Sequence, residues 1–111
     1  MGWATTYIAE LQAGREVQFR PVGNSMQGVI ESGDLVTVVP LKVPPVCGDA
    51  VLCNVNGKQY LHLVSDVQGN NFQISNNQNR VNGWIPLSNI FGVCTLVEAH
   101  AIKTGPRQRQ R

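Results

Sequence analysis

The sequence is short of charged residues, aromatic residues and cysteines, and it has no long hydrophobic run. Only 14% of its 111 residues are charged, against roughly 25% in an average domain, and 6% are aromatic. No apolar run approaches the roughly 20 residues of a membrane-spanning helix, so we expect no membrane anchor. The amino-terminal residues lack the charged start and apolar stretch of a signal peptide. We therefore expect a cytoplasmic protein.

The three cysteines, Cys47, Cys53 and Cys94, exclude two further classes of protein. A secreted disulfide framework favours an even number of cysteines, so we expect reduced thiols. Their spacing fits no zinc site, and no histidine lies close enough in the sequence to complete one. We expect neither a metal nor another cofactor. Cys53 and Cys94 lie in apolar runs and are expected to be buried, whereas Cys47 lies in a loop and is expected to be exposed.

The formal net charge of +2 belongs to the end of the chain. Four of the nine lysines and arginines lie in residues 103–111, and the remaining residues carry five positive and seven negative side chains. The body of the protein therefore has a net charge of −2. We expect no direct contact between the folded body and nucleic acid, although the basic tail could touch an acidic partner.

Length and composition predict one domain with many turns. A hydrophobic content of 42% is enough for a core without disulfides or metal, and 11 glycines with 6 prolines favour short strands. We expect a single domain over residues 1–102 and a disordered basic tail over 103–111. The predicted fold class is mostly β, with curled antiparallel sheets and one or two short helices.

Local patterns predict individual elements of this fold. A helix is expected over residues 4–13, capped by Thr5 or Thr6. Asn56-Gly57 lies between two β-rich runs, which is typical of a type I′ hairpin. Further strands are expected around residues 17–21, 34–41, 64–76 and 84–102.

Ser25 is the first candidate for chemistry. It follows Gly23-Asn24 and precedes one predicted helical turn, so its hydroxyl is expected to project from a tight turn. Backbone N–H groups at such a turn can bind a developing oxyanion. The alternative is an ordinary helix N-cap, which is the commoner role of a serine in this position.

The segment GNSMQGVIESGDLVTV resembles the nucleophile segment of the LexA-like and signal-peptidase-like serine peptidases. Their pattern is Ser-Met, a variable residue, usually Pro, and then an aliphatic residue and Gly-Asp before a strand. Gly28 stands here in place of the proline. The resemblance extends from about residue 8 to residue 98, and implies the β-clip-like fold of that superfamily with Ser25 as the nucleophile.

The segment CGDAVLCNVNGKQYLHLV resembles the next part of the family, a hairpin whose second strand carries the general base. Counted from Gly48, the base position falls on His62, where LexA-like members have lysine and eukaryotic and archaeal signal peptidases have histidine. Neutral imidazole, with a pKa near 6.5, can accept a proton at neutral pH. The alternatives are a structural role for His62 and a base role for Lys58, which is expected to be solvated at the hairpin tip.

The segment FQISNNQNR resembles the region where relatives carry an acidic residue followed by asparagine. The acidic position is occupied by Asn76, whose amide oxygen could orient an imidazole but could not stabilise imidazolium as a carboxylate does. Asp66 is a poor third member, since strand geometry puts it roughly 13 Å from His62. The sequence thus predicts a Ser25-His62 dyad, with Ser25 and Asn76 as weaker candidates for oxyanion binding and orientation.

Two classes of function remain open. The first is a stand-alone serine endopeptidase that hydrolyses a peptide or protein substrate through the Ser25-His62 dyad. The second is a non-catalytic, UmuD-like module that forms a homodimer and acts in the DNA-damage (SOS) response or in a mobile element. Only 24 residues precede Ser25, so we expect no helix-turn-helix domain before it, and we do not expect self-cleavage at Ala13-Gly14.

Overall fold

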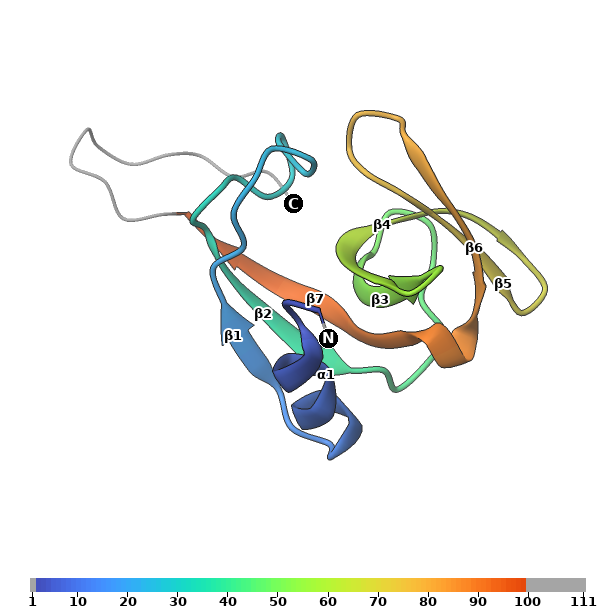
Figure 1. The fold of residues 1–111 in the computed structure, drawn as a ribbon, viewed down its shortest axis with the longest axis horizontal. Helices are drawn as coiled ribbons and strands as arrows, with labels where there is room; N and C mark the ends of the chain where they lie inside the picture. The colour runs from blue at the N-terminus through green and yellow to red at the C-terminus, as the bar shows by residue number, and fades with distance from the viewer. Residues whose placement is uncertain (1, 100–111) are drawn as a thin grey trace.

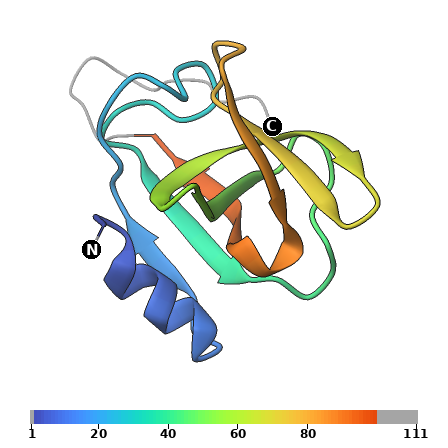
Figure 2. The same cartoon turned by 45° about the vertical axis from the view of Figure 1, so that its right-hand side comes forward.

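The computed structural model describes residues 2–99, which form one antiparallel sheet of seven strands and a single short α-helix (Figures 1 and 2). The predicted mostly-β fold class is therefore confirmed. The basic tail, residues 103–111, lies outside the described residues. Among residues 2–99, no helix is both long and apolar enough to cross a membrane.

The elements follow one another in a simple order, and the strands occur in the sheet as β1-β2-β7-β3-β4-β5-β6. Strand β7, which comes last in the sequence, thus lies between β2 and β3 and joins the two parts of the sheet. The elements are α1 (Thr5–Gln12), β1 (Val17–Phe19), β2 (Leu35–Pro40), β3 (Ala50–Val55), β4 (Lys58–Gln68), β5 (Asn71–Ser75), β6 (Val81–Pro86), the 3-10 helix η1 (Leu87–Asn89) and β7 (Ile90–Glu98).

The sheet curls, so its two parts enclose separate hydrophobic cores. Figure 1 shows β1, β2 and β7 beside α1 on one side, and β3 to β6 wound together on the other. Strand β3 contributes to both cores because successive side chains of a strand point to opposite faces. Its Leu52 packs in the core beneath α1, and its Val51 and Cys53 pack in the core within the β3–β6 part.

Helix α1 begins one residue later than predicted and is capped differently. Ile8 and Leu11 are buried, as their spacing suggests, but the N-cap residue is Ala4 and no side chain caps the helix. The predicted capping by Thr5 or Thr6 is wrong because the Thr5 hydroxyl is used elsewhere, where it accepts hydrogen bonds from the Gly2 N–H and the Gln59 side-chain amide.

The hairpin predicted around Asn56-Gly57 is confirmed. Both turn residues have positive φ, 52° and 84°, as a type I′ turn requires. The strands β3 and β4 pair over six residues, and this register places His62 opposite Val51. The position of the candidate base is therefore fixed by a regular, well-paired strand.

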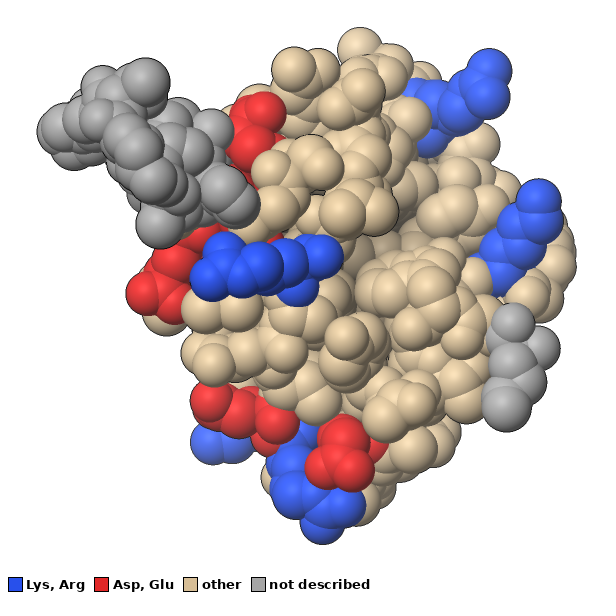
Figure 3. All heavy atoms as spheres, turned by 60° about the vertical axis from the view of Figure 1, so that its left-hand side comes forward, with Lys and Arg blue, Asp and Glu red and all other residues tan. Residues whose placement is uncertain are grey.

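The cysteines are free, as expected, but only two of the three have the predicted exposure. Cys47 is exposed and Cys53 is buried, and burial raises the pKa of the Cys53 thiol to about 12. Cys94, which was expected to be buried, is half-buried. Figure 3 shows one face of the molecule, on which charged side chains of both signs are scattered without a continuous basic patch.

Candidate active site

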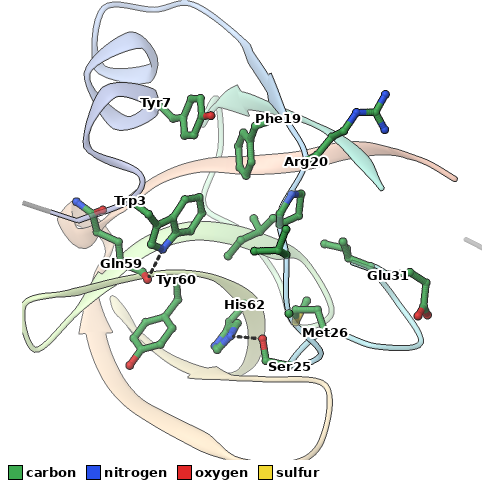
Figure 4. Close-up of a pocket in the computed structure, with 15 residues that line it drawn as sticks. Trp3, Tyr7, Phe19, Arg20, Ser25, Met26, Glu31, Gln59, Tyr60 and His62 are labelled. Atoms are coloured by element: carbon green, nitrogen blue, oxygen red, sulfur yellow. Dashed lines mark hydrogen bonds between the residues drawn. The ribbon is translucent and has the colours of Figure 1, made fainter. Parts of the chain in front are cut away.

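The fold brings Ser25 and His62 together although 37 residues separate them in the sequence. The Ser25 Oγ lies 3.1 Å from the His62 Nε2, which is hydrogen-bonding distance. Figure 4 shows the two side chains facing each other at one end of a pocket. A nucleophile and a base at this distance are the minimum requirement for nucleophilic catalysis by serine.

A third side chain holds the other side of the imidazole ring. The Asn82 Oδ1 lies 2.7 Å from the His62 Nδ1. Because an amide oxygen only accepts hydrogen bonds, the Nδ1 carries the proton and the Nε2 lone pair is directed at Ser25. This tautomer is the one that a general base needs in order to accept the hydroxyl proton of the serine.

The surroundings of His62 keep its imidazole neutral. The side chain is buried, and the ring of Tyr60 packs against it with ring centroids 4.7 Å apart. Burial lowers the pKa of His62 below its usual value because it disfavours the charged form, and the hydrogen bond to Asn82 opposes this effect in part. The imidazole of His62 is therefore unprotonated at neutral pH.

A β-bulge in β6 delivers Asn82 to the histidine. In the pairing of β5 with β6, Ile74 faces Gly83 and Ser75 faces Val81, so Asn82 is an extra residue without a partner. Bulges often redirect a side chain next to an active site. Here the bulged residue is the one that contacts the base.

The orienting contact expected of Asn76 is made by Asn82 instead. The Asn76 Oδ1 accepts hydrogen bonds from the backbone N–H groups of Gln78 and Arg80, and its own N–H donates to the Arg80 carbonyl. Asn76 thus closes the turn between β5 and β6. Its amide oxygen is already used within that turn, which explains why it does not reach His62.

Ser25 lies in an irregular loop, residues 20–34, whose backbone is fixed by several local hydrogen bonds. The predicted helical turn is present as a single Ile30 N–H to Met26 carbonyl bond of 2.8 Å, and both side chains are buried. The Gly33 N–H donates to the Pro21 carbonyl and closes the two ends of the loop. The loop is therefore anchored to the core by two residues that follow the serine, and its two ends are joined by a hydrogen bond.

A second loop, residues 76–80, fastens the serine loop from outside. The Asn77 N–H donates to the Ser25 carbonyl at 2.9 Å, and the Asn77 side-chain amide donates to the Gln27 carbonyl at 2.8 Å. The Gln78 side chain donates to the Asn24 carbonyl at 2.9 Å. Three carbonyl groups of the serine loop, within four residues, are thereby tied to the connection between β5 and β6 that precedes Asn82.

Gly28 has a backbone conformation that the proline expected from the resemblance could not adopt. Its φ is +99°, a value that proline, with φ fixed near −65°, cannot adopt. A Cβ at this position would lie 3.0 Å from the Asn77 side-chain nitrogen. The Gly28 N–H, which proline would lack, donates to the Glu31 carboxylate. The substitution is therefore part of how this particular loop is built.

The backbone around Ser25 offers donors for an oxyanion. Within residues 2–99, the N–H groups of Ser25 and Met26 have no hydrogen-bond acceptor. Two adjacent N–H groups at a turn form a site for negative charge. The expected role of the Ser25 N–H is compatible with this arrangement.

The serine and histidine lie at one end of an open pocket of about 710 Å³. One wall comes from β4, and the opposite wall comes from β1 and the serine loop (Figure 4). The residues that matter below are Trp3, Tyr7, Phe19, Ser25, Tyr60 and His62.

The other candidates have ordinary structural roles. Lys58 is exposed at the start of β4, as expected for a solvated hairpin lysine. The Asp66 carboxylate accepts from the Val67 N–H, and Asp34 is buried and accepts from the Glu31 N–H. No three of His, Cys, Asp and Glu among residues 2–99 form a group that could hold a metal ion.

Sequence reasoning missed Tyr60, Asn77 and Asn82. Tyr60 could have been found, because residues i and i+2 of a strand share a face, and Tyr60 therefore lies beside His62. No local signal distinguishes Asn82 from the neighbouring asparagines. The sequence matches no protein-family model and no curated protein, so a function must be inferred from this geometry and from the resemblance of the motifs.

Proposed function

We propose that this protein is a serine peptidase of the LexA and signal-peptidase type, in which Ser25 is the nucleophile and His62 the general base. The observation that carries the proposal is the continuous chain of contacts from the Ser25 Oγ through His62 to Asn82, 3.1 Å and 2.7 Å long. An N-cap serine does not require a buried, neutral and oriented imidazole beside its hydroxyl. The resemblance of the Ser-Met…Gly-Asp segment supports the same assignment.

The proposed chemistry follows from the tautomer of His62, which has its proton on Nδ1 and a free lone pair on Nε2. The His62 Nε2 takes the Ser25 proton while Oγ attacks the peptide carbonyl, which forms a tetrahedral oxyanion facing the Ser25 and Met26 N–H groups. His62 then gives the proton to the leaving amine as the C–N bond breaks, which leaves an acyl ester on Ser25. Water, activated by the same imidazole, hydrolyses this ester and restores the hydroxyl.

Asn82 makes this site weaker than one with an aspartate. The amide oxygen fixes the ring and its tautomer, but it carries no charge to stabilise the imidazolium that forms in the transition state. We therefore expect a slow enzyme, suited to a substrate that is held at the site for a long time. The low pKa of His62 is consistent with the same absence of a carboxylate.

The open edge of β4 is the expected docking site for the substrate backbone. Strand β5 pairs with β4 only from Leu63 onwards, so the first residues of β4 have a strand partner on the β3 side alone. Along β4 from the Asn56-Gly57 turn, the backbone N–H and C=O groups of every second residue point away from β3. The groups of Gln59 and Leu61 therefore point to the open edge. The Gln59 carbonyl is taken by the Trp3 indole, so Leu61 offers the free N–H and C=O for β-augmentation.

Labelling with a fluorophosphonate probe tests the proposal directly. The unmodified protein should be labelled at Ser25, as identified by mass spectrometry of the labelled peptide. The Ser25→Ala variant should not be labelled, and the Ser88→Ala variant, which removes an exposed serine of η1, should be labelled normally. Equal labelling of the Ser25→Ala variant, or no labelling of the unmodified protein, would refute the peptidase proposal.

The alternative function, a non-catalytic dimerising module, has one observation in its favour. Strand β6 is at the edge of the sheet and exposes Val81 and Trp84, which are 52% and 43% accessible. Trp84, which was expected mainly to pack, thus contributes to an apolar edge. Sedimentation equilibrium of the unmodified protein and of the Trp84→Lys variant tests it. A dimer that dissociates in the variant supports the module, and a monomer in both rules it out.

A further inference from the structure

The end of the pocket farthest from Ser25 is built from three aromatic rings, Trp3, Tyr7 and Phe19, which we call the aromatic wall. The Tyr7 and Phe19 rings stack at 4.4 Å, and the Trp3 ring meets Phe19 edge-on at 5.6 Å. The rings come from the segment before α1, from α1 itself and from β1. Figure 4 shows them grouped on the side of the pocket away from the Ser25-His62 pair.

Trp3 is held in position but is not covered. Its indole N–H donates to the Gln59 carbonyl at 3.0 Å, and the next residue, Ala4, donates from its backbone to the Gln59 side chain at 2.7 Å. Nevertheless, 52% of the Trp3 surface is accessible to solvent. An apolar ring that is fixed before binding loses little side-chain entropy when a ligand covers it. This combination is characteristic of a binding surface.

Strand β4 sets the distance between the aromatic wall and the catalytic pair. Gln59, which fixes Trp3, is three residues before His62 on this strand, and strand geometry separates them by about 10 Å. An extended peptide has the same rise per residue. A substrate whose scissile carbonyl lies at Ser25 therefore presents a side chain to the aromatic wall about three residues from the scissile bond.

We propose that the aromatic wall selects extended peptides that carry a large apolar side chain, such as leucine, methionine or phenylalanine, about three residues from the cleaved bond. This inference rests on the proposed peptidase function and specifies its substrate class. Two charged residues also line the pocket, and each makes a hydrogen bond to the backbone of the serine loop: Arg20 donates to the Gly33 carbonyl and Glu31 accepts from the Gly28 N–H. An aspartate seated against the three aromatic rings would lose hydration.

The test measures binding rather than turnover, so it does not depend on catalysis. The Ser25→Ala variant is titrated with blocked hexapeptides that differ only in having Phe, Leu, Ala or Asp at one position, moved along the peptide. The readout is the NMR signal of the Trp3 indole N–H. We expect the Phe and Leu peptides to shift this signal and to bind about tenfold or more tightly than the Ala and Asp peptides.

Trp84 provides a matched control, because it is a comparably exposed indole outside the pocket. The Trp84→Phe variant assigns the two indole signals and should keep the preference for large apolar residues. The Trp3→Ala variant lacks the Trp3 signal, so its affinities are measured by isothermal titration calorimetry, and it should show no preference. Equal affinity for the four peptides, or an equal loss in both variants, overturns the inference. Equal shifts produced by free indole or a straight-chain fatty acid overturn it as well, because they indicate an unselective apolar cavity.

The outcomes separate this inference from the proposed function. Selective peptide binding without fluorophosphonate labelling would leave the aromatic wall as a peptide-binding site and remove the peptidase. Labelling of Ser25 without selective binding would leave the peptidase and remove this substrate class.

Discussion

Ser25 and His62, the proposed nucleophile and base, are held by two very different parts of the molecule. His62 lies on a strand whose register is set by six paired residues and by a tight two-residue turn. Ser25 lies in a loop without a helix or strand, which is held by two hydrogen bonds from Asn77 and one from Gln78. The position of the strand is fixed by its regular pairing and its turn, whereas the position of the loop depends on a few contacts, most of them at the surface.

This difference indicates how substitutions in each region should affect the candidate site. A change on β4 should alter the chemistry of the base and leave the serine where it is. A change in the serine loop should alter the distance between Ser25 and His62 and leave the base intact. Since a displacement of about 1 Å can reduce a rate by about 100-fold, the loop should be as important for activity as the base itself.

The largest effect is expected for His62→Ala, which removes the proposed base from strand β4. The rate of fluorophosphonate labelling should fall by about 10²- to 10⁴-fold, the usual contribution of a general base. Addition of free imidazole should restore part of the rate, because the position opens into the pocket. A His62→Ala variant that is folded by circular dichroism and is labelled at the unmodified rate would show that another group activates Ser25.

The Gly28→Ala substitution strains the serine loop. At φ +99°, with a Cβ contact of 3.0 Å to Asn77, alanine should destabilise the protein by about 1–3 kcal/mol and slow labelling by up to about 100-fold. Gly14→Ala is the matched control, since Gly14 has a similar φ of +88° but nothing within 4 Å of its Cβ position. It should lower the stability in urea without slowing labelling. Equal rates in both variants would contradict the role of the loop.

The Asn82→Asp substitution tests the contact that orients the imidazole of His62. A carboxylate beside the His62 Nδ1 raises the pKa of His62, because it stabilises the imidazolium. As the solution is acidified, labelling of the variant should therefore be lost at a higher pH than labelling of the unmodified protein. Above that range labelling should be about fivefold faster, since a charged hydrogen bond is stronger by about 1 kcal/mol than a neutral one. The pH profile of labelling measures both effects, and an unshifted acidic limb would contradict the assigned contact.

The regular part of the site could be predicted from sequence. The Asn56-Gly57 turn fixes the hairpin, and the base position that the family resemblance implies, counted from Gly48, falls on His62. The observed distance of 3.1 Å to Ser25 agrees with the predicted pairing of these two residues. Prediction worked here because a two-residue turn leaves little freedom in register.

The rest of the site depends on features that leave no local signature. Asn82 reaches His62 only because β6 has a bulge at that residue, and a one-residue slip would send its side chain to the other face of the sheet. The sequence gives no reason to place the bulge there rather than at Asn76 or Asn79. Likewise, the contact of Asn77 with the Ser25 carbonyl joins two loops 52 residues apart. Such contacts are set by the packing of the whole sheet.

The smallest expected effect is on the free energy of unfolding, and it concerns only His62 on strand β4. The pKa of His62 is lowered in the folded state, so below its ordinary value of about 6.5 the unfolded chain binds a proton that the folded protein does not. The free energy of unfolding should therefore decrease as the pH falls from about 6.5 towards the lower folded-state pKa. Urea unfolding at a series of pH values measures this slope. The His62→Gln variant should lack this contribution, while carboxylates and His100 contribute equally to both proteins. If the two proteins lose stability in parallel between pH 7 and 5, His62 is not kept neutral by burial, and the base must be activated in another way.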